Sequence, residues 1–123
     1  MKRLFPLLLI VLISSVLVQQ KAEAQVFSTK LKITIVDALG NVVQDAKVRI
    51  FKNEADYTQE ANDLQPFQLT NAKGQVTFKK LEAASYYILV RKGDLDNTDG
   101  GSIVDTLKAG KVNKVNIVIT DGL

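Results

Sequence analysis

Apolar and polar residues alternate along most of the chain from residue 30 onward. The segment 30–37 places Leu31, Ile33 and Ile35 on one face, with lysine and threonine on the other. A period of two is typical of a β-strand with one buried face. Comparable apolar segments recur at 42–52, 67–70, 75–81, 86–92, 103–107 and 112–120. Seven short strands at near-regular spacing predict an all-β fold, a seven-stranded antiparallel Greek-key sandwich.

The alternation also predicts which side chains fill the interior. Beyond the first strand, the expected core residues are Ala46, Val48, Ile50, Val76, Phe78, Tyr87, Val115, Ile117 and Ile119. In the segment 86–92, Leu89 and Arg91 share the face of Tyr87, while Ile88 and Val90 take the other face. A strand that is apolar on both faces is expected in the centre of a sheet.

Two longer segments interrupt the strand pattern. Residues 53–66 are polar and acidic, which predicts a loop with at most one helical turn around residues 56–61. Residues 93–102 are acidic and rich in glycine, which predicts a second loop. Because glycine and asparagine tolerate positive φ, Gly40-Asn41 and Gly74 mark shorter turns between strands.

The first 24 residues have the pattern of an export signal. Lys2 and Arg3 precede a largely apolar run over residues 4–18, and Ala22-Glu23-Ala24 offers small residues at the two positions that a signal peptidase reads. Cleavage is therefore expected before Gln25. The alternative is an uncleaved membrane anchor, but the apolar run of 15 residues is short for a span of about 20 residues.

This pattern predicts the domain organisation and the location of the protein. We expect a signal peptide at 1–24, a flexible lead-in at 25–29 and one domain at 30–123. The protein is expected to be exported to the periplasm or the extracellular space. Its contact with a membrane would be limited to the cleaved signal peptide.

Charge and residue usage exclude several functions. The leader contains three of the 16 basic residues and one of the 13 acidic ones, so 13 basic and 12 acidic residues remain after cleavage. This balance gives no support for a nucleic-acid partner, which would require a clustered basic surface. The chain has no histidine and no cysteine, which excludes Ser-His-Asp and Cys-His sites and zinc sites with nitrogen or sulfur ligands.

Two groups of residues carry a family resemblance. The first group is Asp37, Gly40, Val43, Ala46 and Val48. The second group is Thr70, Gly74, Val76, Phe78, Leu81 and Tyr87. Their spacing resembles the two hairpins of carboxypeptidase regulatory-like domains. This resemblance implies a prealbumin-like (transthyretin-like) sandwich of immunoglobulin-like architecture, here as a stand-alone module. The motif residues occupy turns and core positions, so they point to a fold and not to a reaction.

The wider prealbumin-like group includes activities that this chain does not support. The purine-breakdown hydrolases of this group use histidines and a Tyr-Arg-Gly-Ser tail, whereas this chain ends Thr120-Asp121-Gly122-Leu123. Related pilin and adhesin modules form an isopeptide bond from a first-strand Lys, a late Asn and a buried Glu. Lys32 and Asn116 are present, but the catalytic Glu is missing. Neither the hydrolase activity nor the cross-link is expected.

The acidic loop offers one candidate metal site. Asp94, Asp96 and Asp99 lie close together in the sequence, and Asp105 follows. Calcium takes six to eight oxygen ligands, which a flexible acidic loop can supply. The spacing departs from that of the helix-loop-helix calcium motif, and a solvated hairpin tip has the same composition. Calcium is thus an alternative, and no other cofactor is expected.

Four aromatic residues are candidates for a partner surface. Phe51, Tyr57, Phe67 and Tyr86 fall on outward positions or in the long loop, where they could bind a sugar or a protein. The other interpretation is that residues 53–66 fold back and cover Phe51 and Tyr86 as a second small core.

The sequence therefore predicts a non-enzymatic, exported binding or scaffold module. Loops 53–66 and 93–102 would be presented to a protein or carbohydrate ligand, or a partner strand would join an open sheet edge. One alternative is a calcium-stabilised adhesion module using the segment 94–105. Another is a carboxylate-based hydrolase, which would need two carboxylates that converge in an apolar pocket.

Overall fold

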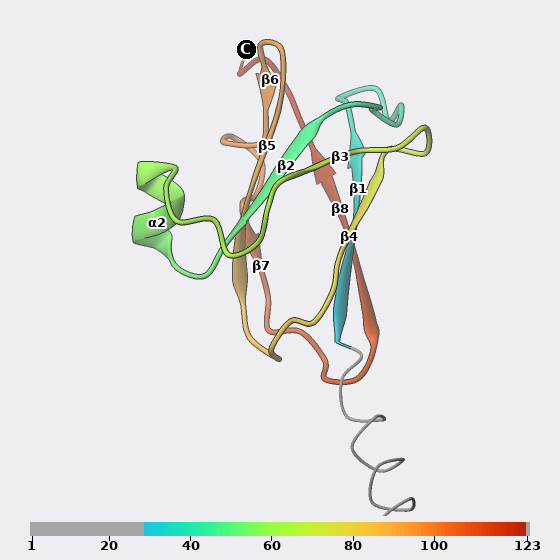
Figure 1. Cartoon of the computed structure of the whole chain (residues 1–123). Coiled ribbons are helices and arrows are strands. Elements are labelled where there is room, and N and C mark those ends of the chain that lie inside the picture. Colours follow the sequence, from blue (N-terminus) through green and yellow to red (C-terminus); the bar gives the residue numbers. More distant parts are fainter. Residues whose placement is uncertain (1–28, 123) are drawn as a thin grey trace, which may run out of the picture.

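Two β-sheets face each other across an apolar interior (Figure 1). The computed structural model describes residues 29–122, so the predicted signal peptide at 1–24 lies outside the described residues, as does most of the lead-in. The elements are β1 (Lys30–Val36), β2 (Lys47–Phe51), α2 (Glu54–Gln59), β3 (Gln68–Leu69), β4 (Gln75–Phe78), β5 (Tyr86–Lys92), β6 (Leu95–Asp96), β7 (Ile103–Val104) and β8 (Val112–Val118). None of the helices among these residues has the length and apolar character that a membrane span requires.

The strand order divides the chain between a three-stranded and a five-stranded sheet. The three-stranded sheet has the order β4-β1-β8. The five-stranded sheet has the order β3-β2-β5-β6, and β7 also pairs directly with β5. The strand β6 pairs with residues 91–92 of β5, and β7 pairs with residues 86–87. At one corner the chain after β8 reaches across to the other sheet, where Thr120 forms an isolated bridge with Asp96.

The structure confirms the β-sandwich and corrects its details. The described residues form eight strands instead of seven, because the acidic segment 93–102 contains the short β6. The sheets are also not purely antiparallel, since β1 and β8 pair in parallel over seven residues, from Lys30 opposite Val112 to Val36 opposite Val118. Parallel neighbours require a long connection between them, and here the rest of the domain is that connection.

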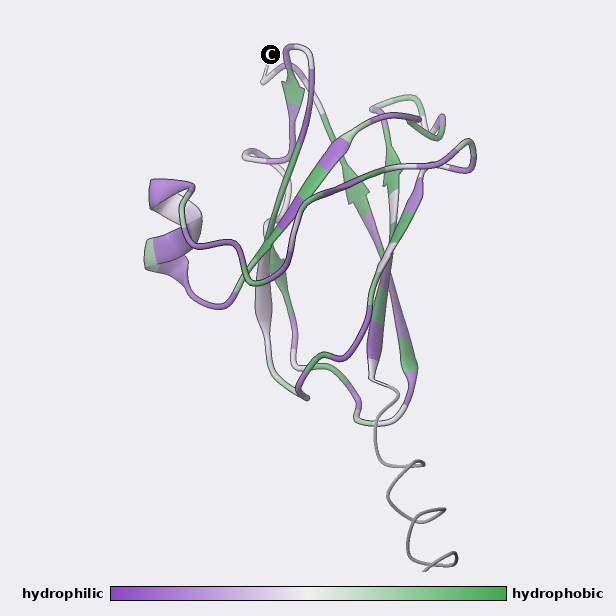
Figure 2. Ribbon diagram, in the orientation of Figure 1, coloured by the Kyte–Doolittle hydropathy of each residue, from purple (hydrophilic) through white to green (hydrophobic). Residues whose placement is uncertain are grey.

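The core lies between the sheets and follows the predicted alternation. Leu31, Ile33 and Ile35 of β1 are fully buried. Figure 2 shows hydrophobic segments along the strands, with hydrophilic colour on α2 and on many turns. Of the other predicted core residues, Ala46, Val48, Ile50, Val76, Phe78, Ile117 and Ile119 are buried and Val115 is half-buried against them.

The two faces of β5 are exchanged relative to the prediction. Tyr86, Ile88 and Val90 point into the core, whereas Tyr87 lies on the outer face and is only half-buried. The segment is apolar on both faces, so hydrophobicity alone does not decide its register, and a shift of one residue reverses every side chain. Burial raises the pKa of the Tyr86 hydroxyl, which donates a 2.8 Å hydrogen bond to the carbonyl of Glu82.

The motif residues have structural tasks in the turns. The Asp37 carboxylate accepts hydrogen bonds from the backbone N–H groups of Leu39 and Asn41, at 3.0 and 2.9 Å. Buried Thr70 accepts from the N–H of Ala46 at 2.9 Å and donates to the carbonyl of Val43 at 2.6 Å. Gly74 has a φ of +72°, and a Cβ there would lie 2.8 Å from the carbonyl oxygen of Ile35. A side chain at this position would therefore clash.

Side-chain amides cap the outer edge of β4. Gln68 donates from Nε2 to the carbonyl of Thr77 at 2.8 Å, and Gln65 donates to the carbonyl of Lys79 at 2.8 Å. These amides take the place of a neighbouring strand and connect the two sheets on that side. Thr29, predicted within the flexible lead-in, is buried and hydrogen-bonded to the turn that precedes β8. Its hydroxyl accepts from the N–H of Gly110 at 2.8 Å.

Helix α2 covers the outer face of the five-stranded sheet. The helix begins at Asn53, whose side chain accepts a 2.9 Å hydrogen bond from the N–H of Asp56. The Tyr57 ring packs edge-on against Phe51 at 6.0 Å and lies 5.8 Å from the ring of Tyr87. Residues 53–66 thus fold back over Phe51, as one of the two interpretations of the sequence expected.

Ion pairs fasten this segment to the sheet. Arg49 binds both carboxylate oxygens of Asp63, at 2.7 and 2.9 Å, and donates to the carbonyl of Glu60 at 2.8 Å. Arg91 holds the Glu60 carboxylate with both of its terminal nitrogens. Hydrogen bonding to Arg49 lowers the pKa of Asp63, and hydrogen bonding to Arg91 lowers the pKa of Glu60.

Replacing Arg49 with Ala should lower the free energy of unfolding by about 1–2 kcal/mol, because it removes charge-assisted hydrogen bonds at a half-buried site. Arg49→Lys should recover only part of this loss, since an ammonium group cannot bind both oxygens of Asp63 in a fork. Urea unfolding followed by tyrosine fluorescence measures both effects. Equal stability of the three proteins would contradict this role.

The same pairs predict a dependence of stability on pH. A carboxyl group whose pKa is lowered by folding stabilises the folded state above its unfolded pKa, and this contribution is lost as the pH falls through the folded pKa. The difference in unfolding free energy between the wild type and Arg49→Ala should therefore be largest at neutral pH. It should shrink below about pH 4, where Asp63 and Glu60 take up protons. Urea midpoints at pH 7, 5 and 3 test this, and a constant difference would refute it.

Candidate functional site

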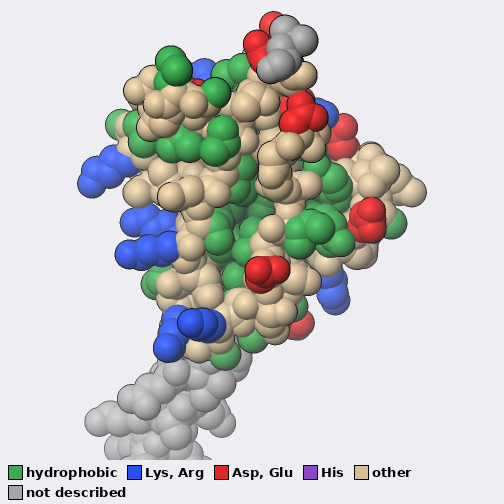
Figure 3. All heavy atoms as spheres, turned by 180° about the vertical axis from the view of Figure 1, so that it is seen from behind, with side chains coloured by type: hydrophobic (Ala, Val, Ile, Leu, Met, Phe, Trp, Pro, Cys, Tyr) green, Lys and Arg blue, Asp and Glu red, His purple; other side chains and the backbone are tan. Residues whose placement is uncertain are grey.

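An open groove runs between the edge of β8 and the segment 100–108, which includes β7. Its volume is about 750 Å³. Buried Val104 and Leu107 lie on one wall, and Val115 and Ile117 of β8 lie on the other. Figure 3 views this side of the molecule and shows hydrophobic side chains along the middle of the face and most of the visible basic side chains along one side. We call this feature the edge groove.

Both walls of the edge groove are strand edges. Lys111 accepts a hydrogen bond from the N–H of Lys30, and Ile119 donates one to Val36, so odd-numbered residues of β8 face β1. The backbone groups of the even-numbered residues 112–118 therefore point away from β1, because successive residues of a strand alternate. On the opposite wall Ser102 accepts from the N–H of Ile88, which directs the backbone groups of Ile103 outward.

Apolar side chains at outward positions mark the same edges. Ile103 is 62% exposed, Val112 is 49% exposed and Val118 is 43% exposed. Large apolar residues grouped beside an open groove are typical of interaction sites. The sequence showed these residues individually, but it did not reveal that β7 and β8, which belong to different sheets, face each other.

Asn97 shapes the loop that ends at the groove. Its fully buried side chain accepts from the N–H of Val90 at 2.9 Å and donates to the carbonyl of Ile88 at 2.8 Å. The amide thereby pairs with β5 in the gap between β6 and β7, where the strand edge would otherwise lose its partner. Gly100 and Gly101 then continue to the groove wall. By residue type alone, Asn97 cannot be distinguished from an ordinary turn residue.

The four candidate calcium ligands do not gather at one point. Asp94 and Asp105 are exposed, in the β5–β6 turn and after β7. Asp96 accepts hydrogen bonds from the N–H and the hydroxyl of Thr98, at 3.0 and 2.6 Å, and these bonds lower its pKa. Asp99 is exposed near Gly122. No group of three or more acidic side chains within residues 29–122 could hold a metal ion together. Calcium binding stays a prediction.

The candidate aromatic surface is divided by the fold. Phe51 is fully buried beneath α2 and Tyr86 is 3% exposed in the main core, so neither forms an open platform. Tyr57 is half-buried between Phe51 and Tyr87. Phe67 is exposed, with the Lys47 ammonium 4.4 Å from its ring centre. Phe51 was predicted to point outward, and it does, but α2 covers that face.

Lys32 and Asn116, the two residues considered for an isopeptide bond, lie outside the core. Lys32 pairs in register with Lys114, and Asn116 with Thr34, all at outward positions of the three-stranded sheet. A buried isopeptide bond between Lys32 and Asn116 has no support in this arrangement.

Three solved structures are similar to this chain. The TIE protein of Bacillus anthracis matches with a TM-score of 0.55 and 16% identity, over 76% of this chain and 17% of that one. BcpA, the major pilin subunit of Bacillus cereus, matches with a TM-score of 0.52 and 12% identity, over 77% of this chain and 30% of that one. A streptococcal ancillary pilin has a TM-score of 0.48 and 18% identity, over 76% and 30%.

The present chain spans less than a third of the length of each of these three proteins. At such identities, the first two likenesses show the fold, a β-sandwich, and nothing further. No protein-family profile matches the chain, and a search of curated proteins finds no match.

Replacing Asn97 with Ala should lower the free energy of unfolding by about 2–4 kcal/mol, because two buried backbone groups of β5 lose their partner. Hydrogen exchange should show faster exchange at the Val90 amide. The exposed Asn116→Ala is the matched control and should change stability by less than about 0.5 kcal/mol. A loss equal to that of the control would show that Asn97 does not organise this loop.

Proposed function

We propose that this chain is a non-enzymatic, exported binding module that receives an extended peptide of a partner protein in the edge groove. The observation that carries this proposal is the pair of open strand edges on either side of a groove lined by apolar side chains. An added strand gains affinity from backbone hydrogen bonds and specificity from the side chains that enter the groove. The segment 93–102, predicted to be presented to a ligand, supports this site because its end lines the groove.

The added strand has a definite chemistry in this proposal. If it extends the three-stranded sheet beyond β8, every second side chain faces inward over Val104, Val115 and Ile117. These positions call for apolar residues. The intervening side chains lie beside Lys114 and Asn116 at the surface, and they call for polar residues. The expected ligand is therefore an extended segment with apolar residues at alternate positions.

Electrostatics support binding over catalysis. A general acid needs a carboxyl group whose pKa is raised. The carboxyl groups with a resolved shift, Glu60, Asp63 and Asp96, all have a lowered pKa, owing to hydrogen bonds from arginine or Thr98. Glu60 and Asp63 also hold the segment 53–66 against the sheet. The hydrolase alternative therefore has no candidate acid among these three residues.

The resemblance to carboxypeptidase regulatory-like domains supports the same proposal. Asp37, Thr70 and Gly74 perform the turn functions that the motif implies, and the β-sandwich fold agrees with a prealbumin-like module. We place the chain among such modules. A major pilin subunit is among the proteins that share its fold, and a module of this fold that binds another protein is in line with that likeness.

Proline substitution at the strand edge tests the proposal. Asn116→Pro removes an N–H that points away from β1, so the sheet stays intact while strand addition is blocked. Thr77→Pro is the matched control, because its N–H also points outward, on the opposite edge that Gln68 caps. A phage library of ten-residue peptides with alternating apolar residues, selected on the protein purified from cells that express the full chain, supplies the probe.

Asn116→Pro should weaken the selected peptides at least tenfold, and Thr77→Pro should leave their affinity unchanged. Amides of residues 112–118 should gain protection from hydrogen exchange when the peptide binds. Failure to select any peptide, or equal affinity for both proline variants, would overturn the groove as the site. A concentration-dependent dimer abolished by Asn116→Pro would instead assign the edge to a second copy of the chain.

A further inference from the structure

The outer face of the three-stranded sheet concentrates positive charge. Its outward positions hold Lys30 and Lys32 on β1 and Lys114 on β8, and the exposed Lys79 follows β4. Among residues 29–122, the outward positions of these three strands include no Asp or Glu. We call this surface the lysine face. It is distinctive because the chain after residue 24 is nearly neutral, with 13 basic and 12 acidic residues.

Two of these lysines stand directly beside each other. Lys32 and Lys114 are register partners on neighbouring strands, which lie about 4.8 Å apart. Like charges at such positions destabilise a sheet. The ion pairs of the described part of the chain involve Arg49 and Arg91, so no acidic side chain in that part offsets this repulsion through a salt bridge. A charge arrangement that opposes folding indicates a role in binding.

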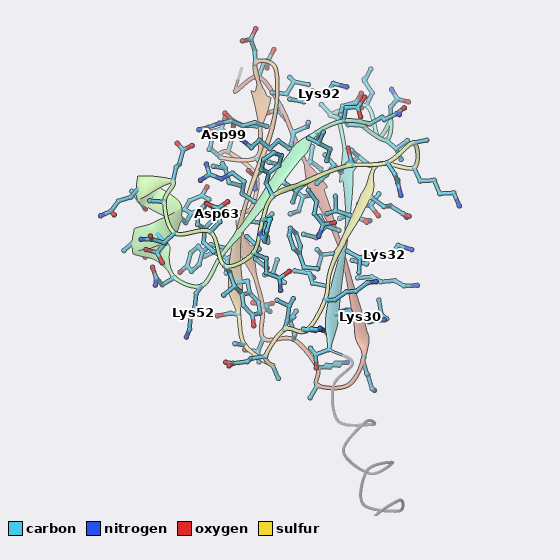
Figure 4. The ribbon with its side chains drawn as sticks, viewed as in Figure 1. Lys30, Lys32, Lys52, Asp63, Lys92 and Asp99 are labelled. Atoms are coloured by element: carbon cyan, nitrogen blue, oxygen red, sulfur yellow. The ribbon has the colours of Figure 1, made fainter. Side chains whose placement is uncertain are left out.

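The lysine face also has shape and hydrogen-bonding capacity. A shallow hollow of about 630 Å³ lies over it, lined by Lys30, Lys32 and Lys79 together with the polar Gln75 and Thr77. Figure 4 shows Lys30 and Lys32 projecting from β1 away from the five-stranded sheet. Ammonium groups bind carboxylates or sulfates, while amide and hydroxyl groups bind sugar hydroxyls.

We propose that the lysine face binds an acidic polysaccharide, a ligand class separate from the peptide of the edge groove. An extended polymer with repeated negative charges could contact several lysines at once, because they repeat along β1 and across to β8. The outward positions of the three strands include no aromatic side chain, the residue type that anchors proteins at a membrane interface. The polar residues between the lysines suit a hydroxylated polymer better than a lipid surface.

Charge reversal on the central strand tests this proposal. The protein purified from cells that express the full chain is applied to immobilised polygalacturonate, with neutral dextran as the reference surface. The wild type should bind polygalacturonate at low ionic strength, bind dextran at least tenfold more weakly, and elute as salt screens the charges. The double variant Lys30→Glu/Lys32→Glu should bind polygalacturonate at least tenfold more weakly than the wild type.

Lys52→Glu is the charge-matched control for the single variant Lys32→Glu, because each reverses one charge and Lys52 is exposed near α2, on the opposite side of the molecule in Figure 4. This variant should bind almost as tightly as the wild type. Lys32→Glu alone should weaken binding and also raise the melting temperature, since it converts the Lys32–Lys114 repulsion into attraction. Weaker binding by a more stable protein cannot result from unfolding.

Three results would overturn the proposal. The first is absence of wild-type binding to polygalacturonate at low salt. The second is equal weakening of binding by Lys52→Glu and by Lys32→Glu, which would show that net charge, and not the lysine face, determines binding. The third is tighter binding to phosphatidylglycerol vesicles than to the polysaccharide, which would assign the lysine face to a membrane surface. Peptides selected for the edge groove should bind Lys30→Glu/Lys32→Glu normally, so the two proposals can fail separately.

Discussion

The parallel pairing of β1 with β8 is the constraint on which the rest of the structure depends. It joins the first and last strands of the described domain over seven residues and closes the three-stranded sheet around the core. The pairing gives β1 two neighbours and leaves β8 with one. The open edge of β8 then becomes a wall of the edge groove, and the alignment of Lys32 with Lys114 creates the centre of the lysine face. Both candidate sites thus follow from one strand pairing.

Much of the fold could be predicted because burial on one face leaves a period of two in the sequence. Leu31, Ile33 and Ile35 illustrate this, since each is fully buried as expected. The period of two does not decide the inward face where apolar residues occupy both faces of a strand, as at Tyr86 and Tyr87. The helix α2 is longer than the single turn predicted, although Asn53 followed by Asp56 is a recognisable helix start. Both differences are local, and the two-sheet architecture does not depend on them.

The candidate sites could not be predicted in the same way because they depend on which strands become neighbours. The sequence separates Ile103 from Val118 by a turn and a strand, and only the assembled sheets place them along one groove. Asn97 shows the same limit. Its residue type indicates a turn, whereas its buried amide pairs with Val90 and Ile88 in place of a strand. Nothing in the local sequence specifies such a substitution.

The amide caps of Gln65 and Gln68 restrict how this protein could assemble. Open-ended filaments need two complementary surfaces on each subunit, one to give and one to receive. The outer edge of β4 already has its carbonyls at Thr77 and Lys79 occupied by these amides, whereas the edge of β8 is open. Within the three-stranded sheet, addition of a strand at β8 would therefore end after one step. Growth of this sheet in both directions would require the loss of both glutamine contacts.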